Sequence, residues 1–229
     1  MLEKIKSGLV VSCQALEDEA LYGADIMKKM ADAVTRGGAM AIRANGINDI
    51  LAIKMAIKVP MIGIIKREYP DSEVYITPTI KEVEQLVEAG VELIAIDATN
   101  RLRPNGVALQ DFIKELKNRF PKQKWMADCA TLEDCLGAEA LGFDCVGTTL
   151  YGYTKETLNK KLYEHDFEFL KEVVAHVNVP VIAEGNVLTP EQAAKALEYG
   201  AHAVVVGGAI TRPQQITERF VAAIKEVTK

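Results

Sequence analysis

The chain has 229 residues, 49% hydrophobic and 26% charged, which is typical of a globular protein and predicts one domain or at most two. Its 27 basic and 32 acidic residues give a formal net charge of -5, and no basic run occurs, so we expect no nucleic-acid partner. No apolar stretch reaches transmembrane length and the charged start lacks a signal-peptide core, so we expect no membrane partner.

The cysteines point to the same kind of environment. Cys13, Cys129, Cys135 and Cys145 form no C-x-x-C pair, and their number is far below that of a disulfide scaffold. We therefore expect reduced thiols and a cytoplasmic location.

Short apolar runs alternate with longer amphipathic segments along the whole chain. The runs have the length and aliphatic character of strands buried on both faces, and they cover residues 8–12, 39–42, 61–65, 93–96, 125–127, 145–147, 179–183 and 203–206. The intervening segments repeat apolar residues every three or four positions, which predicts helices over 17–34, 47–57, 79–89, 109–120, 131–141, 166–176, 190–199 and 213–227.

Candidate caps support these boundaries. Helices are predicted to begin after Thr79, Thr131 and Thr189 and to end at Gly90, Gly142 and Gly200. Eight strand–helix units in a chain of this size predict an α/β fold, a (β/α)8 TIM barrel formed as a single domain by residues 1–229. A doubly wound sheet would usually stop at five or six strands.

Polar side chains stand where the apolar strands end, which is where catalytic residues lie in this fold. They include Gln14, Arg43, Lys66, Asp128 and Glu184. Lys66 ends a wholly apolar strand, so burial close to an arginine should lower its pKa and let it act as a base near neutral pH. We expect Lys66, Glu184 and Asp128 to act as acids or bases. Arg43 and Gln14 are expected to orient the ligand as hydrogen-bond donors. The alternative is a structural ion pair between Lys66 and Glu184.

The last two units carry a phosphate-binding pattern. Gly185 and Asn186 follow the seventh strand, while Gly207, Gly208 and Arg212 follow the eighth. Glycines let backbone N–H groups approach an anion, and the loops after these two strands form the recurrent phosphate site of such barrels. The pattern predicts a phosphorylated small molecule as the ligand. The alternative is that the two consecutive glycines only turn the chain.

Neither a metal nor a nucleophilic cysteine is indicated. None of His165, His176 and His202 stands at a strand exit, and no H-x-H or H-E-x-x-H spacing occurs. Cys129 follows Asp128, but no histidine is placed to activate it. We therefore expect no metal and no cofactor.

Several segments resemble the bacterial N-acylglucosamine-6-phosphate 2-epimerases, also called N-acetylmannosamine-6-phosphate 2-epimerases. The resemblance spans essentially the whole chain and is carried by GLVVSCQA, AIRANG, IGIIKREY, ITPTIKEVEQLVEAG, IAIDAT, ADCAT, GTTLYGYT, VIAEGNVLTPEQAAKAL and VVVGGAITRPQQIT. It implies interconversion of N-acetylmannosamine 6-phosphate and N-acetylglucosamine 6-phosphate in sialic acid catabolism, by a metal-independent homodimer. It also implies catalytic roles for Lys66 and Glu184, and sugar contacts by Gln14, Arg43, Asp128 and Arg212.

The chemistry of these residues agrees with such a reaction. C2 of the sugar becomes acidic only when C1 is a free aldehyde, so the ring opens before a base removes the proton. Lys66 follows the third strand and Glu184 the seventh, so their side chains should approach the sugar from opposite sides of the barrel mouth. This arrangement suits a two-base inversion at C2. In the one-base alternative, Lys66 transfers the proton on both faces of the sugar carbon. Two other functions stay open, a Schiff-base aldolase using Lys66 on a phosphorylated keto acid or aldehyde and a non-catalytic sugar-phosphate sensor.

Overall fold

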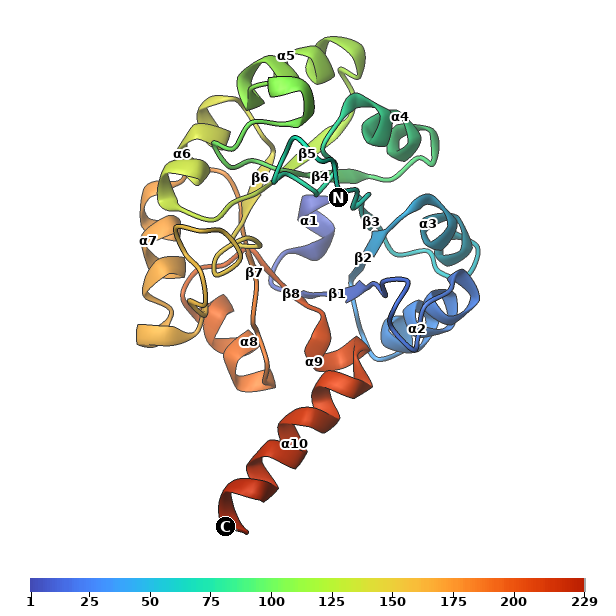
Figure 1. Cartoon of the computed structure of the whole chain (residues 1–229), viewed down its shortest axis with the longest axis vertical. Helices are drawn as coiled ribbons and strands as arrows, with labels where there is room; N and C mark the ends of the chain where they lie inside the picture. The colour runs from blue at the N-terminus through green and yellow to red at the C-terminus, as the bar shows by residue number, and fades with distance from the viewer. Residues whose placement is uncertain (229) are drawn as a thin grey trace.

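The computed structural model describes residues 1–228, in which parallel strands close into a barrel surrounded by helices (Figure 1). The strands are β1 (Leu9–Cys13), β2 (Ala41–Asn45), β3 (Met61–Ile64), β4 (Leu93–Asp97), β5 (Lys124–Asp128), β6 (Cys145–Gly147), β7 (Val181–Glu184) and β8 (Ala203–Val206). The α-helices are α1 (Leu2–Ile5), α2 (Ala24–Arg36), α3 (Ile47–Lys54), α4 (Ile80–Glu88), α5 (Leu109–Arg119), α6 (Leu132–Ala140), α7 (Glu168–His176), α8 (Pro190–Glu198), α9 (Gly208–Thr211) and α10 (Pro213–Val227). Neighbouring strands pair in chain order and β8 pairs with β1, so the (β/α)8 prediction is confirmed.

The alternation of side chains along each strand creates two apolar layers. On β1, Val11 packs between the strands and the outer helices, whereas Val10 belongs to the cluster that fills the barrel interior. The short helix α1, which the sequence did not predict, closes the bottom of the barrel. Its Ile5 is fully buried against the interior cluster. The barrel is thus solid, and its opposite end is left for a site.

The predicted caps are confirmed. Thr79 and Thr131 each form a capping box, with Glu82 and Asp134 respectively, and the Thr189 hydroxyl accepts the backbone N–H of Gln192 in the first turn of α8. The glycines at the ends of α4, α6 and α8 all adopt the left-handed backbone conformation. These local signals explain why the helices begin and end where the sequence predicted.

The first predicted helix begins later than expected. We predicted a helix from Glu17, but residues 17–22 form turns and α2 begins only at Ala24. Gly23, with φ of +131°, supplies a backbone conformation that L-residues rarely adopt, and the helix starts after it. The acidic residues of 17–22 therefore belong to a loop at the mouth of the barrel.

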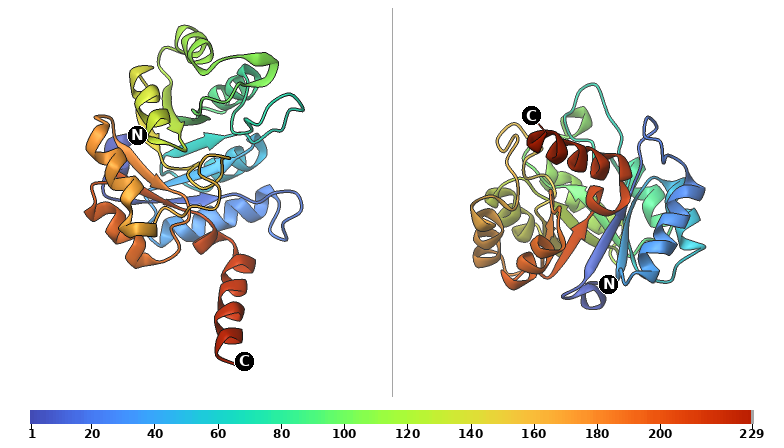
Figure 2. Two further views of the ribbon diagram at one scale, coloured as in Figure 1. Left: turned by 60° about the vertical axis from the view of Figure 1, so that its left-hand side comes forward. Right: turned by 90° about the horizontal axis from the view of Figure 1, so that it is seen from below.

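The last helix does not cover the barrel. Residues 213–227 are helical as predicted, but α10 projects away from the molecule, and none of its residues is buried (Figures 1 and 2). The chain breaks its helical path at Arg212, where φ is −121° and ψ is 85°. The outer layer between α8 and α2 is consequently left without a long helix. No helix of the described part of the chain is both long and apolar enough to cross a membrane.

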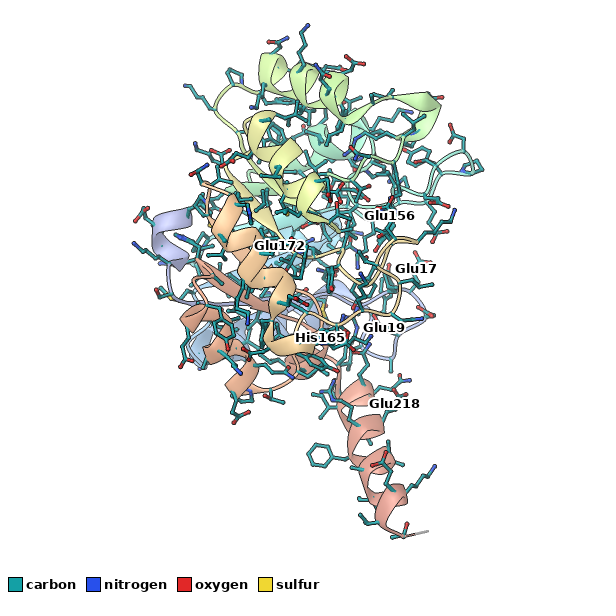
Figure 3. All side chains as sticks on the ribbon, turned by 90° about the vertical axis from the view of Figure 1, so that its left-hand side faces the viewer. Glu17, Glu19, Glu156, His165, Glu172 and Glu218 are labelled. Atoms are coloured by element: carbon teal, nitrogen blue, oxygen red, sulfur yellow. The ribbon has the colours of Figure 1, made fainter. Side chains whose placement is uncertain are left out.

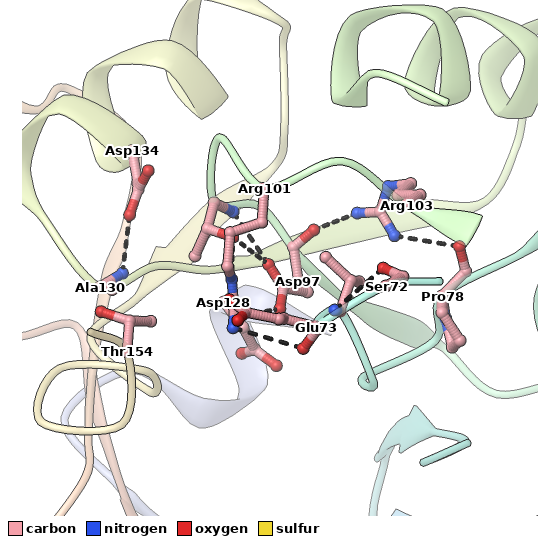
Figure 4. Close-up of polar contacts among 12 residues, drawn as sticks. Ser72, Glu73, Pro78, Asp97, Arg101, Arg103, Asp128, Ala130, Asp134 and Thr154 are labelled. Carbon is pink, nitrogen blue, oxygen red and sulfur yellow. Dashed lines mark hydrogen bonds and ion pairs between the residues drawn. The ribbon is translucent and has the colours of Figure 1, made fainter. Parts of the chain in front are cut away.

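A buried arginine fixes the loops that follow β3 and β4. The guanidinium of Arg103 donates to the backbone carbonyls of Thr77, Pro78 and Asp97 and lies 4.3 Å from the centroid of the Phe112 ring (Figure 4). Burial lowers the pKa of Arg103 to about 10. Because all its partners are backbone or aromatic groups, we assign Arg103 to the support of the active face.

Candidate active site

A cavity of about 390 Å³ opens at the C-terminal end of the barrel. Its lining includes Gln14, Arg43, Lys66, Glu184, Gly185, Asn186, Gly207, Gly208 and Arg212, which are all the predicted site residues except Asp128. Other lining residues lie outside that set, among them Glu19, Thr149 and Tyr153. Thr149 follows the sixth strand and carries the same signal as the predicted site residues, a polar side chain at a strand end, whereas Glu19 lies in a segment that we predicted to be helical.

The guanidinium of Arg43 joins two carboxylates that belong to different strands. Its Nη1 and Nη2 lie 3.1 and 2.6 Å from the two oxygens of Asp128, and its Nη1 lies 3.0 Å from Oε2 of Glu184. Asp128 is fully buried behind the arginine, which itself is 1% exposed. Asp128 therefore acts on the cavity through Arg43, and Arg43 fixes where Glu184 lies.

Glu184 ends β7, and its carboxyl group has a raised pKa. Burial raises the pKa of Glu184 to about 7, against the opposing effect of Arg43. Thr148 fixes the backbone beneath it, because the threonine hydroxyl accepts the Glu184 N–H at 3.0 Å and donates to the Glu184 carbonyl at 2.7 Å. Thr148 thus fixes the main chain of Glu184, and the carboxyl group can gain or lose a proton near neutral pH.

Lys66 follows β3 and lies half-buried in the same cavity. Burial lowers its pKa to about 8, and the positive charges of Arg43 and Arg212 act in the same direction. Among the described residues no carboxylate lies within ion-pairing distance of its ammonium, and Glu184 pairs with Arg43 instead. The alternative of a structural Lys66–Glu184 ion pair is therefore wrong. Both groups are free to exchange protons with a ligand.

The rim of the cavity offers donors for an anion. Arg212 is held by Glu19, which lies beside the start of α10 (Figure 3), through a bond of 3.1 Å from Nη2 and a second from Nε. Its Nη1 makes no hydrogen bond to any described residue and remains available. At Gly208 a Cβ would meet only the end of the exposed Gln215 side chain, which could move aside, so packing alone does not require glycine there.

Two polar groups in the cavity lack partners. Oε1 of Gln14 and Nδ2 of Asn186 are buried and accept or donate no hydrogen bond within the described residues. The Gln14 side chain is oriented by its own Nε2, which donates to Ser12 at 2.8 Å. One acceptor and one donor are thus available for a polar ligand.

The histidines lie away from this cavity. His165 stands on the surface near α7 (Figure 3), and His176 and His202 contact backbone carbonyls of Glu172 and Leu2. Residues 1–228 contain no cluster of three His, Cys, Asp or Glu side chains that could hold a metal ion.

A TIM barrel with a buried lysine and glutamic acid beside an anion-binding rim defines an enzyme that moves protons on a small anionic substrate. Comparison with known proteins identifies its family. Residues 27–226 match the family model described as "Putative N-acetylmannosamine-6-phosphate epimerase". The chain belongs to this family of epimerases.

Individual relatives agree. A protein of Enterobacter sp. (strain 638) named "Putative N-acetylmannosamine-6-phosphate 2-epimerase" is 59% identical over 98% of this chain and 96% of its own. A protein of the same name from Listeria innocua is 54% identical over 99% of this chain and 98% of its own.

Solved structures add a close match and a distant one. The N-acetylmannosamine-6-phosphate 2-epimerase from Clostridium perfringens superimposes with a TM-score of 0.92 at 53% identity, covering 97% of this chain and 96% of that one. A thiamine phosphate pyrophosphorylase from Pyrococcus furiosus matches with a TM-score of 0.63 at 18% identity, over 100% of this chain and 99% of that one, which reflects the barrel fold alone.

Proposed function

We propose that this protein inverts C2 of N-acetylmannosamine 6-phosphate to give N-acetylglucosamine 6-phosphate, a step in sialic acid catabolism. The observation that carries the proposal is a lysine with a pKa of about 8 and a glutamic acid with a pKa of about 7 in one cavity. Family membership supports the substrate and disfavours the aldolase and sensor alternatives.

The substrate is held at its two ends. Backbone N–H groups at Gly207 and Gly208, together with Nη1 of Arg212, bind the phosphate. The unpartnered groups of Gln14 and Asn186 bind hydroxyl or amide groups of the opened sugar. Because the phosphate is remote from C2, it contributes binding energy without taking part in the proton transfers.

Lys66 and Glu184 carry out the inversion. One of them removes the proton from C2 of the open-chain aldehyde, and the other returns a proton to the opposite face, with the roles exchanged in the reverse direction. The pair matches this task because each group can serve as acid or base near neutral pH. Arg43 contributes positive charge beside the enolate that forms between the two transfers.

Proton NMR in D2O tests the reaction. With N-acetylmannosamine 6-phosphate and EDTA present, we expect N-acetylglucosamine 6-phosphate that carries deuterium at C2. Neither product nor exchange would reject the proposed function, and loss of activity in EDTA would reject our expectation of a metal-independent enzyme. If no product forms, borohydride trapping of a substrate adduct on Lys66 would instead identify an aldolase.

The pH profile distinguishes two bases from one. Below about pH 7 both groups are protonated and no base is present; above about pH 8 both are deprotonated and no acid is present. We therefore expect a narrow bell in kcat/KM with its maximum between these two values. A profile that rises through pH 8 to a plateau would show that neutral Lys66 works alone as the base.

Arg212→Ala tests the phosphate site. A lost contact between charged groups weakens ground and transition states alike, so we expect KM to rise about 10- to 100-fold with little change in kcat. Initial rates over a wide substrate range measure both constants. A large fall in kcat at unchanged KM would contradict the assignment of Arg212 to the phosphate.

We further propose that the protein is a homodimer in which α10 of each chain packs on the barrel of the other. Phe220, Ile224 and Val227 recur at helical spacing on α10, and their side chains are 68%, 59% and 84% exposed. The side of the barrel between α8 and α2 lacks a long covering helix (Figure 1). A two-fold arrangement would let each chain cover the side left open in its partner.

The double variant Phe220→Asp/Ile224→Asp tests the dimer. We expect it to be monomeric in analytical ultracentrifugation and to unfold at a lower temperature, because the charges cannot be buried at an interface. Ala222→Asp is the matched control, since Ala222 stands on the opposite face of α10 and its change should leave the dimer intact. A monomeric wild-type protein would overturn the proposal.

A cytoplasmic location is also proposed. The four cysteines are free thiols in the structure, all of them buried, which fits a reducing compartment. A phosphorylated sugar as substrate supports the same compartment, because its charge prevents free passage across a membrane. Fractionation of the native organism, with the enzyme activity followed in each fraction, would test the location.

A further inference from the structure

A single hydroxyl group lies between the two carboxylates that flank Arg43. Thr149, two residues after β6, is half-buried and lines the cavity. Its Oγ1 lies 2.7 Å from Oδ1 of Asp128 and 3.3 Å from Oε2 of Glu184. Thr149 is therefore a second group, besides Arg43, that contacts both carboxylates.

A threonine hydroxyl has one hydrogen, so it can donate to only one of these oxygens. An O–H···O bond is best near 2.7 Å and is weak at 3.3 Å, so the hydrogen points to Asp128. Asp128 then receives three donors, two from Arg43 and one from Thr149. The lone pairs of Thr149 are left facing Glu184.

This arrangement has unequal effects on the two acids. Asp128 accepts three hydrogen bonds. Glu184 accepts a single N–H, from Arg43 at Oε2, and the same oxygen faces the hydroxyl lone pairs of Thr149, which repel a carboxylate more than a neutral carboxyl group. The smaller number of donors and the facing lone pairs consequently favour the protonated form of Glu184.

We propose that Thr149 is a positioning residue that donates its hydrogen to Asp128, turns its lone pairs towards Oε2 of Glu184, and thereby favours the protonated form of Glu184. The inference rests on the proposed function, because Glu184 needs that proton to act as an acid at C2. The same contacts hold Oε2, while Oε1 of Glu184 has no hydrogen-bond partner among residues 1–228 and is free to meet the substrate.

Thr149→Val removes the hydroxyl at nearly constant volume. We expect the acidic limb of the kcat/KM profile to move down by about half to one pH unit, because the Glu184 carboxylate no longer faces the lone pairs of the Thr149 hydroxyl. Valine places a methyl group where the hydroxyl was, and less polar surroundings would by themselves raise the pKa of Glu184 and move the limb to higher pH. A shift to lower pH therefore cannot result from the loss of polarity. Thr149→Ser should restore the wild-type limb.

Thr148→Val is the matched contrast. The Thr148 hydroxyl bonds only to the backbone N–H and carbonyl of Glu184, so its loss should lower the melting temperature without moving the limb. A limb that stays fixed or moves upwards in Thr149→Val would overturn the inference, the upward shift meaning that Thr149 donates to Glu184.

A second readout does not depend on turnover. Carbon-13 NMR of protein labelled at glutamate carboxyl groups, with Glu184 assigned from Glu184→Gln, follows the protonation of this side chain directly. We expect its titration midpoint to fall in Thr149→Val and to be retained in Thr149→Ser. Absent epimerase activity in the wild type would reject the proposed function, whereas an unshifted or raised midpoint would reject only the role of Thr149.

Discussion

Replacing Lys66 with alanine should lower kcat by about 10³-fold or more, because the reaction then lacks one of its two proton carriers. Lys66 is half-buried, approaches no carboxylate closely enough to form an ion pair, and has its pKa lowered to about 8 by burial and neighbouring arginines. Water cannot replace it efficiently in a cavity shaped for a bound sugar. Turnover of the sugar phosphate, followed by NMR, measures the loss.

Binding of the phosphate provides the control for this variant. The phosphate contacts are backbone groups of Gly207 and Gly208 and the guanidinium of Arg212, none of which bonds to Lys66. We expect inorganic phosphate to inhibit or bind the Lys66→Ala protein nearly as well as the wild type. Residual turnover within about tenfold of the wild-type rate would contradict the assignment of Lys66 as an acid–base group.

Much of the barrel could be predicted because its signals are local. A buried parallel strand reads as a short aliphatic run, and a threonine followed by an acidic residue marks a helix start, as at Thr79 and Thr131. The strand exits then follow from the strands, which is why Lys66 and Glu184 were found in one cavity.

The features that the sequence did not predict depend on contacts between distant segments. The direction of α10 follows from a backbone change at Arg212, and amphipathic periodicity does not say which surface an apolar face meets. Asp128 lies beneath the cavity because Arg43 extends across the barrel and bonds to it. These two residues are 85 positions apart in the sequence. A sequence pattern gives residue types and their spacing, but it does not show that Arg43 separates Asp128 from the cavity.

The polar layer beneath the cavity depends on one positive charge. Arg43 sits between Asp128 and Glu184, two acids that would repel each other without it, and all three are largely or fully buried. The site tolerates this arrangement because two hydroxyl groups, those of Thr148 and Thr149, satisfy neighbouring polar atoms. Stability and catalysis therefore depend on the same residues. A variant that restores stability without activity would distinguish the two roles of Arg43.

Arg43→Met should both destabilise the protein and inactivate it. The change leaves two buried carboxyl groups without a counter-charge, a situation that costs about 3–5 kcal/mol of unfolding free energy in other proteins. The double variant Arg43→Met/Asp128→Asn removes the more deeply buried of these two carboxyl groups. We expect it to recover most of the lost stability but not the activity, since the positive charge beside the enolate is still missing.

The pH dependence of the loss follows from the same argument. Arg43 holds the pKa of Glu184 down, so without Arg43 this pKa rises further above its unfolded value, and the folded state binds more protons and gains stability as the pH falls. Urea unfolding of Arg43→Met should therefore show a larger deficit at pH 8 than at pH 5. In the double variant this difference should shrink, because only one buried carboxyl group remains. A deficit independent of pH, or activity restored together with stability, would mean that Arg43 serves packing rather than charge.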